Sequence, residues 1–347
     1  MYPGGPNPTQ IQFIPPNRAI ANPRPPPLVL LHDGGGTTFS YFLLGSLGRD
    51  VWAVHNSRYF TGDAWEGGME QMVLVYLDGL VREGIRGDIM LGGWSLGGFL
   101  SLAMAHRIAK DPDRYPFSVA GLLLIDSPYH IARSKISQPH SKAPLGNVPD
   151  LVRTAFEHCD AMLQQWDLPR WSGTEGAQET DLEVPGGQRF KLQRSEVLYK
   201  PATGGAKTWS TIRTGTLPST EASTTEAATT DLEISNAAST PEDLVIPGSP
   251  PPAVLIRCTQ FAKLNPEIPS NHPCLVDLNR NEKLLGWEGR YPEFIKAVID
   301  VDADHYQLFD RTHMERMEDV TARLSWGMDI LDALWSTSKA KKGAKTD

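Results

Sequence analysis

Six short apolar runs constrain the fold of this chain more than any other feature of its sequence. They are of strand length and rich in Val, Ile and Leu: Leu28–Leu31, Val51–Val54, Ile89–Gly92, Val119–Ile125, Ala253–Cys258 and Ala297–Val301. Runs with so few polar interruptions are typical of strands buried on both faces of a parallel sheet. Helical patterns lie among them at Gly67–Arg82, Leu96–Lys110 and His313–Trp335. This alternation predicts an α/β fold, with a mostly parallel central sheet flanked by helices.

Size and charge narrow the classes of protein to which the chain can belong. Its 347 residues are enough for one large α/β domain or two small ones. The net charge of −8 and the pI near 5.6 predict an acidic surface that repels phosphate backbones, which argues against nucleic-acid binding. The sequence holds no apolar core of a secretory signal and no run approaching the roughly 20 apolar residues of a membrane span. We therefore expect a cytoplasmic protein without a membrane partner.

The cysteines give no sign of a disulfide framework or a metal site. There are three of them, Cys159, Cys258 and Cys274, which is an odd number without the spacing of metal ligands. The sequence therefore predicts neither a metal nor another cofactor.

A single domain is predicted over residues 28–336. It follows a proline-rich extension at residues 1–27, which holds nine prolines, and it precedes a basic tail at residues 337–347. The lysines of this tail are interpreted as a solvated, frayed end: Lys339, Lys341, Lys342 and Lys345.

An insertion between the fourth and fifth apolar runs, at about residues 129–250, is predicted to form a lid. Pro149–Trp166 has the pattern of an amphipathic helix. Thr203–Asp243 holds sixteen Ser and Thr residues and almost no large apolar side chains. Such a segment buries too little surface to offset its ordering entropy, so we expect it to be disordered.

The candidate nucleophile is Ser95. It lies in a G-x-S-x-G pentapeptide, Gly93-Trp94-Ser95-Leu96-Gly97, with an apolar strand before it and a helical pattern after it. This context is that of a nucleophile elbow, a tight strand–turn–helix in which the serine is strained and its flanking glycines approach each other closely. A plain Gly/Ser turn is the alternative interpretation.

A base and an acid are needed to activate the serine, and in hydrolases with this elbow they follow in the order acid, then histidine. His305 lies in the loop into which the last apolar run leads and is the preferred base, with His272 and His313 as alternatives. Asp126 ends the run Gly121–Ile125 and is the preferred acid, since a carboxylate beside such a run requires a partner. The alternative acids are Glu267, Asp302 and Asp304.

The oxyanion of acyl transfer requires backbone N–H donors. Leu96, directly after the nucleophile, is predicted to supply one of them. Gly34 and Gly35, in the His32–Gly36 loop after the first apolar run, are predicted to supply the other, while His32 and Asp33 orient the loop. A phosphate-binding loop is a poor alternative, because the segment lacks the lysine and the spacing of a P-loop.

Four motifs in this order resemble the thioesterase domains of fungal polyketide and nonribosomal peptide synthases, which have the α/β-hydrolase fold. They are the His32–Gly36 loop, the elbow, Leu124–Pro128 and Ala303–Tyr306, and the likeness covers about residues 28–130 and 250–335. The resemblance implies a serine hydrolase with the acid after the strand that ends at Ile125. Asp304 and Tyr306 flank the histidine where the family often has Gly and Phe.

The resemblance also implies a function in secondary metabolism. We expect a free-standing thioesterase that acts in trans on an acyl chain, a polyketide or a peptide, held by an acyl or peptidyl carrier protein through a phosphopantetheine thioester. The alternatives are a carboxylesterase acting on small oxygen esters and a non-catalytic scaffold that binds a carrier protein.

Overall fold

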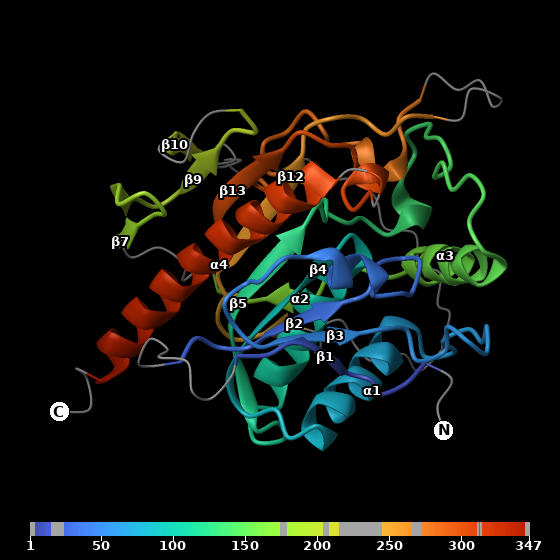
Figure 1. Ribbon diagram of the computed structural model, residues 1–347, viewed down its shortest axis with the longest axis horizontal. Coiled ribbons are helices and arrows are strands. Elements are labelled where there is room, and N and C mark those ends of the chain that lie inside the picture. The colour runs from blue at the N-terminus through green and yellow to red at the C-terminus, as the bar shows by residue number, and fades with distance from the viewer. Residues whose placement is uncertain are drawn as a thin grey trace, which may run out of the picture.

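The computed structural model describes residues 4–14, 24–173, 179–203, 208–214, 245–264, 272–310, 312 and 314–343. These residues form a nine-stranded sheet at the centre of the molecule (Figure 1). Its strands, in spatial order, are β1 (Thr9–Gln12), β3 (Val51–Val54), β2 (Leu28–Leu31), β4 (Gly87–Trp94), β5 (Phe117–Ile125), β12 (Ala253–Cys258), β13 (Ile295–Val301), β9 (Glu196–Lys200) and β10 (Ser210–Arg213). The inner pairs are parallel, while β1 and β10 pair antiparallel at the two edges.

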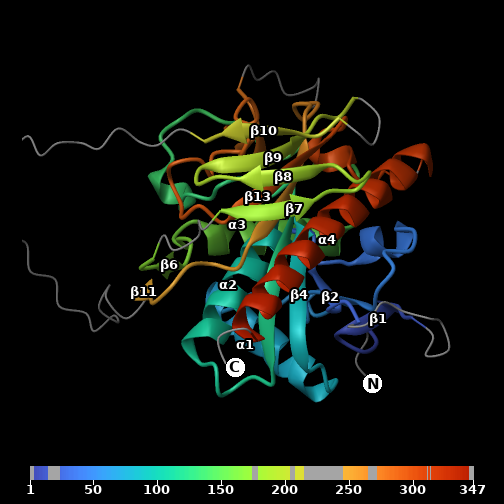
Figure 2. The same ribbon diagram turned by 90° about the vertical axis from the view of Figure 1, so that its left-hand side faces the viewer.

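Helices cover both faces of the sheet. The apolar side chains of each strand alternate between the faces, so Leu122 and Leu124 join one core cluster while Leu123 and Ile125 join the other. The first cluster contains α1 (Gly68–Arg82) and α2 (Leu96–Lys110), and the second contains α4 (Met314–Gly343). Figure 2 shows α4 running diagonally across its face. Continuous apolar strands thus arise because both faces of the sheet are covered.

The predicted α/β fold class is confirmed, with each of the six apolar runs forming a parallel strand of the sheet. The helix predicted over Pro149–Trp166 is α3 (Asp150–Leu163). Within the predicted insertion there are also two small sheets, in which β6 (Arg170–Trp171) pairs with β11 (Val245–Ile246) and β7 (Thr180–Glu183) pairs with β8 (Arg189–Leu192). Within the described residues, no helix has the length and hydrophobicity of a membrane span.

Two segments at the edges of the sheet differ from expectation. Thr9–Gln12, within the predicted extension, joins the sheet as β1. Ser210–Arg213, within the segment expected to be disordered, forms β10, because its backbone pairs with β9 while Trp209 and Ile212 pack against the two core clusters. Residues 204–207 and 215–243 of that segment lie outside the described residues.

The basic tail also begins differently from expectation, because α4 continues to Gly343 rather than ending at Trp335. Lys339 is exposed to solvent but paired, since its Nζ lies 2.8 Å from the Asp88 carboxylate at the start of β4. Ser118 Oγ and Trp335 Nε1 donate to the same carboxylate at 2.6 and 2.8 Å. This carboxylate therefore joins the end of α4 to two neighbouring strands.

Replacement of this carboxylate tests its contribution to stability. Burial alone would raise the pKa of Asp88, but the hydrogen bonds from Lys339, Ser118 and Trp335 outweigh it and lower the pKa to about 2. A lowered pKa stabilises the fold above the ordinary value near 3.8 and ceases to do so as the pH falls through about 2. We expect Asp88→Asn to lower the free energy of unfolding by about 1 kcal/mol at neutral pH. In urea titrations the difference from wild type should shrink below about pH 4, and a difference that grows there would contradict this assignment.

Candidate active site

Ser95 lies at a sharp turn between β4 and α2, with φ 56° and ψ −115°. Few residues other than glycine adopt a positive φ, so this backbone is strained. The flanking glycines make the turn possible: a Cβ on Gly93 would lie 2.7 Å from the Gly97 Cα, and a Cβ on Gly97 would lie 2.4 Å from the Leu31 carbonyl oxygen. Real Cβ atoms do not approach other atoms this closely, so both positions require glycine.

Hydrogen bonds from neighbouring strands hold this turn. The Ser95 N–H donates to the Ile125 carbonyl at 2.9 Å, and Ser127 Oγ donates to the Ser95 carbonyl at 2.7 Å. The Tyr41 hydroxyl accepts from the Trp94 N–H at 2.9 Å and donates to the Leu31 carbonyl at 2.7 Å. The strained conformation of Ser95 is therefore supported by the ends of β2 and β5.

The structure brings Ser95, His305 and Asp126 together, although they follow three different strands. His305 Nε2 lies 3.1 Å from Ser95 Oγ, and His305 Nδ1 lies 2.7 Å from Asp126 Oδ2. His305 is only 2% exposed, and its ring packs against Trp94 with the ring centroids 5.5 Å apart. Two contacts therefore orient the imidazole, a hydrogen bond at its edge and an aromatic ring beside it.

The hydrogen bonds also determine the histidine tautomer. An ionised carboxylate only accepts, so Nδ1 carries the proton that is donated to Asp126. Nε2 then accepts from the Ser95 hydroxyl. This is the arrangement in which an imidazole can remove the proton of a serine.

Asp126 is fully buried, and its carboxylate receives several donors. The Cys258 N–H donates to Oδ1 at 2.8 Å, and Arg280 Nη1 and Nη2 donate to Oδ1 and Oδ2 at 2.6 and 2.9 Å. Burial by itself would raise the pKa of Asp126, but the charge of Arg280 and the hydrogen bond from His305 hold it well below its usual range. Asp126 is therefore ionised at neutral pH.

Arg280 is the residue at this site that the sequence did not indicate. It is fully buried, and its Nε also donates to Asp277 Oδ1 at 2.8 Å. It belongs to a polar stretch between two strands, and an arginine in such a stretch normally faces solvent. The one available signal is its spacing from Asp277, which allows an i, i+3 ion pair in a turn.

The alternative acids and bases lie elsewhere or serve other contacts. Asp302 is exposed and accepts from Gln260 Nε2 at 2.7 Å. Asp304 accepts from the N–H groups of Tyr306 and Gln307, each at 3.0 Å, and so caps the turn that carries His305. The carbonyl of His272 accepts from Ser141 Oγ at 2.6 Å. Glu267 and His313 lie outside the described residues.

In the glycine loop after β2, one N–H group lacks the intramolecular hydrogen bond that its neighbours make within the described part of the chain. The Gly35 N–H donates to Asp33 Oδ1 at 3.2 Å and the Gly36 N–H to the Asp33 carbonyl at 3.0 Å. Within the described residues the Gly34 N–H has no acceptor, and Leu96, as the first residue of α2, has no earlier carbonyl of that helix to bond. Among the described residues, the N–H groups of Gly34 and Leu96 are therefore not engaged in the way that the Gly35 N–H is.

His32 and Asp33 hold the glycine loop. Burial lowers the pKa of His32 to about 4, so its ring is neutral; Nδ1 donates to the Asp33 carbonyl at 2.6 Å, and Nε2 accepts from the Tyr76 hydroxyl at 2.7 Å. Burial raises the pKa of Asp33 to about 7, although the amides of Gly35 and Gly36 act in the opposite direction.

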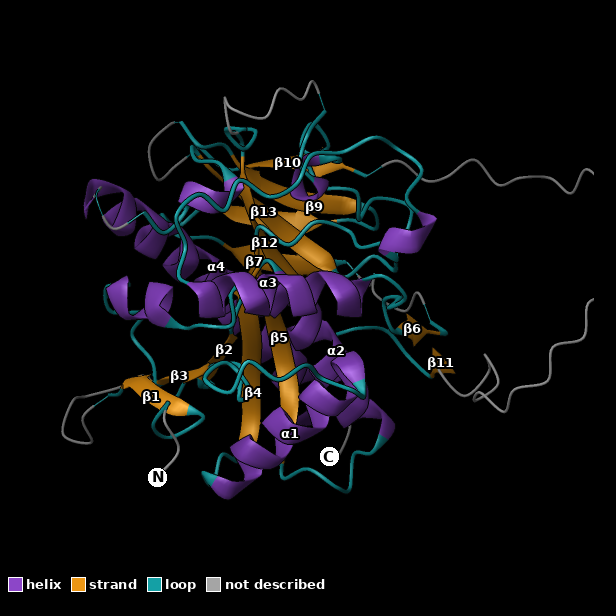
Figure 3. Ribbon diagram, turned by 90° about the vertical axis from the view of Figure 1, so that its right-hand side faces the viewer, coloured by secondary structure: helices purple, strands orange, loops and turns teal. Residues whose placement is uncertain are grey.

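Helix α3 lies directly over this loop, across the end of the sheet (Figure 3). A Cβ on Gly34 would lie 2.9 Å from Phe156, and a Cβ on Gly35 would lie 3.3 Å from the same ring. The side chains of α3 therefore cover the glycine loop at Gly34 and Gly35.

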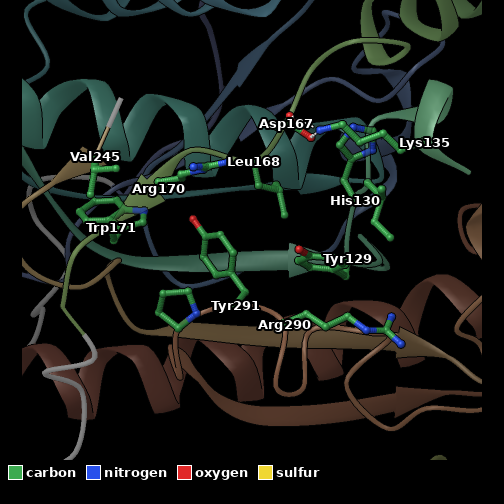
Figure 4. Close-up of a pocket in the computed structure, with 12 residues that line it drawn as sticks. Tyr129, His130, Lys135, Asp167, Leu168, Arg170, Trp171, Val245, Arg290 and Tyr291 are labelled. Carbon is green, nitrogen blue, oxygen red and sulfur yellow. Dashed lines mark hydrogen bonds and ion pairs between the residues drawn. The ribbon is translucent and has the colours of Figure 1, made fainter. Parts of the chain in front are cut away.

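A pocket of about 530 Å³ opens near the end of β5 (Figure 4). Trp171 and Tyr129 lie toward opposite ends of it, with Tyr291 and Leu168 between them. Aromatic, aliphatic and charged residues line it: Tyr129, His130, Ile131, Lys135, Asp167, Leu168, Arg170, Trp171, Val245, Arg290, Tyr291 and Pro292. The His130 ring packs against Phe99 and Trp166 with ring centroids 5.2 Å apart in each case, which connects the pocket wall to α2.

Two helical glycines allow a matched test of the elbow. Gly97→Ala places a methyl group against a backbone oxygen that cannot move aside, so we expect a loss of about 1–3 kcal/mol in stability and a distorted Ser95. Gly79→Ala, in α1, meets nothing closer than 3.4 Å and should be neutral or stabilising. Chemical denaturation, with covalent labelling of Ser95 by a fluorophosphonate, measures both effects. Equal behaviour of the two variants would contradict the close approach at Gly97.

Comparison with known proteins identifies relatives along nearly the whole chain, although no family model matches. A probable thioesterase of Curvularia clavata, KK1J, is 39% identical over 89% of this chain and 92% of its own length. A probable thioesterase of Purpureocillium lilacinum, lcsE, is 35% identical over 96% of this chain and 99% of its own length. A segment amounting to 7% of the nonribosomal peptide synthetase imqB of Aspergillus flavus is 27% identical over 82% of this chain. The chain therefore belongs to the family of fungal thioesterases.

Proposed function

We propose that Ser95, His305 and Asp126 catalyse thioester cleavage through an acyl-serine intermediate. Ser95 Oγ attacks the thioester carbonyl carbon while its proton passes to His305 Nε2. The tetrahedral intermediate then expels the thiol, which takes this proton, and the acyl group remains on Ser95. Water, deprotonated by the same nitrogen, releases the acid and restores the serine.

The observation that carries this proposal is the continuous hydrogen-bonded series from Ser95 Oγ through the His305 ring to Asp126 Oδ2, at 3.1 and 2.7 Å. Both donor–acceptor distances in this series are within hydrogen-bonding reach. The ionised and buried Asp126 holds the required tautomer and stabilises the positive charge that forms on the imidazole.

The oxyanion of the tetrahedral intermediate is assigned to the N–H groups of Leu96 and Gly34. Support for this assignment is that Leu96 follows Ser95 in sequence and that the loop of Gly34 follows the strand whose Leu31 carbonyl lies against the elbow. Two fixed amides stabilise the negative oxygen more than the neutral carbonyl of the substrate, which lowers the barrier.

The proposed substrate is an acyl chain, a polyketide or a peptide, that a carrier protein holds through a phosphopantetheine thioester. Support comes from the similarity to a segment of a nonribosomal peptide synthetase, an enzyme whose name describes the assembly of peptides. Action in trans is supported by the two relatives that this chain spans at 92% and 99% of their length, because both are named as thioesterases rather than synthetases.

We assign the covering of the site to α3. Phe156 contacts the positions of Gly34 and Gly35, so an acyl chain bound next to these amides must pass the α3 surface. A helix in this place excludes water from the oxyanion and limits which nucleophile reaches the acyl-serine.

Two aspartates near the histidine provide a matched test of the catalytic acid. Asp126→Asn should lower kcat/KM for an acyl-pantetheine by about 10³–10⁴-fold, because the amide no longer selects the correct imidazole tautomer. Asp302→Asn, at an exposed carboxylate three residues from His305, should retain wild-type activity. Ser95→Ala should abolish turnover. An active Asp126→Asn variant, or an inactive Asp302→Asn variant, would overturn the assignment.

The substrate class is tested with one acid presented in three forms: its N-acetylcysteamine thioester, its pantetheine thioester and its alkyl oxygen ester. Each kcat/KM is divided by the rate of alkaline hydrolysis of the same compound, which removes differences in intrinsic reactivity. We expect the pantetheine thioester to be favoured over the shorter thioester by about tenfold or more, since additional contacts are made with the longer arm. A preference for the oxygen ester would refute the proposed substrate class.

A further inference from the structure

We propose that Arg280 is a positioning residue of the triad, which fixes the Asp126 carboxylate and sets the lower pH limit of catalysis. The inference rests on the proposed function, because it assigns to Arg280 an effect on the acid and base of that same site. It differs from a purely structural role, since it concerns how readily His305 takes up a proton.

The Arg280 guanidinium binds the Asp126 carboxylate in a bidentate arrangement. Nη1 donates to Asp126 Oδ1 at 2.6 Å and Nη2 to Oδ2 at 2.9 Å, so the guanidinium binds both oxygens. Such bidentate pairs fix the plane of the carboxylate as well as its position. The carboxylate plane in turn directs Oδ2 to His305 Nδ1 at 2.7 Å.

The guanidinium is itself held from the other side. Its Nε donates to Asp277 Oδ1 at 2.8 Å, and Nη1 also donates to the Cys258 carbonyl at 2.9 Å. Asp277 Oδ2 accepts from the Ala262 N–H at 2.8 Å, which anchors this second carboxylate to the segment after β12. Asp126, Asp277 and Arg280 each have 0–1% exposed side chains, so water does not screen their charges.

The titratable groups around the pair of His305 and Asp126 come from several elements. Ser95 and Asp126 follow β4 and β5, Cys258 ends β12, and Asp304 and Tyr306 belong to the turn of the histidine itself; Cys274, Asp277 and Arg280 form the adjacent segment. Burial raises the pKa of Cys258 and of Tyr306 well above their usual ranges and that of Cys274 to about 11, so these three remain neutral at working pH. The charges in the group are therefore the carboxylates of Asp126, Asp277 and Asp304 and the guanidinium of Arg280.

Arg280 opposes the attraction between these carboxylates and a protonated His305. Without its positive charge, Asp126 would act on the imidazolium with its full negative charge and would stabilise the charged ring more strongly. Loss of Arg280 would also raise the pKa of Asp126, because its charge is the main influence that keeps the carboxyl ionised despite burial. At acidic pH the first effect favours the protonated base, and the second favours the neutral acid. Both effects therefore move the acid limb of the activity profile to higher pH.

The test follows the rate at which a fluorophosphonate probe labels Ser95 as a function of pH. The probe requires only the activated serine and the oxyanion donors, so the natural acyl chain need not be known. In Arg280→Gln we expect the acid limb to move up by about one to two pH units. Labelling near pH 6 should then fall by about tenfold or more, with a smaller change on the alkaline plateau. An acid limb at the wild-type position would overturn the proposal and leave Arg280 a structural role alone.

Arg257, in β12, provides a control with a similar bidentate ion pair. It is 5% exposed and binds both oxygens of Asp300, with Nε and Nη2 at 2.7 and 2.8 Å. Its Nη1 reaches the backbone carbonyls of Arg280 and Glu282, and among the described residues its recorded hydrogen bonds go to these groups rather than to the triad. Arg257→Gln should therefore lower stability without moving the acid limb. An equal shift in this variant would mean that the limb reports general loosening of the fold, which contradicts the proposal.

Two further variants keep the proposal testable if Arg280→Gln does not fold. Arg280→Lys keeps the charge and loses the bidentate contact, so its limb should stay near that of wild type while its plateau falls. Asp277→Asn removes one negative charge from the cluster, so its limb should move toward lower pH, opposite to Arg280→Gln. A shift toward higher pH in Asp277→Asn, or a large shift in Arg280→Lys, would refute the electrostatic role.

Failure of this inference is distinguishable from failure of the proposed function. If the probe does not label wild-type Ser95 at any pH, the proposed function fails. If wild type is labelled and the Arg280 variants share its acid limb, only the role of Arg280 fails.

Discussion

The hydrogen bond between His305 and Asp126 joins two segments that are 179 residues apart in the chain, and the candidate site depends on it. A carboxylate buried without donors is strongly destabilising, so Asp126 is tolerable only where several elements converge on it. Those elements are the end of β5, the Cys258 amide of β12, the turn after β13 and the segment that carries Arg280. Asp126 and His305 therefore come together only where the sheet and the segments beside it are in place.

The close approach of two backbone segments at the elbow is the second feature on which the candidate site depends. The first turn of α2 lies so close to β2 that a methyl group on Gly97 would collide with the Leu31 carbonyl oxygen. This closeness brings the end of β2, from which the glycine loop continues, against the turn that carries Ser95. The strain at Ser95 and the approach of this loop therefore have one cause, the tight contact between a strand and the helix that follows its neighbour.

Much of this arrangement could be predicted from the sequence, because it depends on patterns that physical constraints impose. Continuous apolar runs revealed the inner strands except β9, which lies within the predicted insertion, and the glycines around Ser95 revealed the elbow. Asp126 stood out as a polar residue directly after such a run, and His305 as a histidine in the loop after another, where parallel strands present their carboxyl ends to a common edge. Their hydrogen bonds, however, required the structure.

Other features leave little trace in the sequence. Edge strand β10 is made of Ser210–Arg213, whose stability comes from backbone pairing rather than from an apolar pattern. Lys339 resembles a tail lysine because its partner, Asp88, is remote in sequence. Arg280 was overlooked for a related reason: a buried arginine is recognised only by the carboxylates around it, and Asp126 lies 154 residues away.

The central claim, that Ser95 carries the acyl group, is tested most directly by trapping the intermediate. Wild-type protein is mixed with an acyl-pantetheine, quenched in acid within the first turnover and digested with trypsin. The peptide of residues 87–107 contains Ser95 and one other hydroxyl residue, Ser101, so fragmentation distinguishes the two. We expect the acyl mass on Ser95. Turnover of the thioester with the acyl group found on another residue, or with hydrolysis retained in Ser95→Ala, would contradict the mechanism.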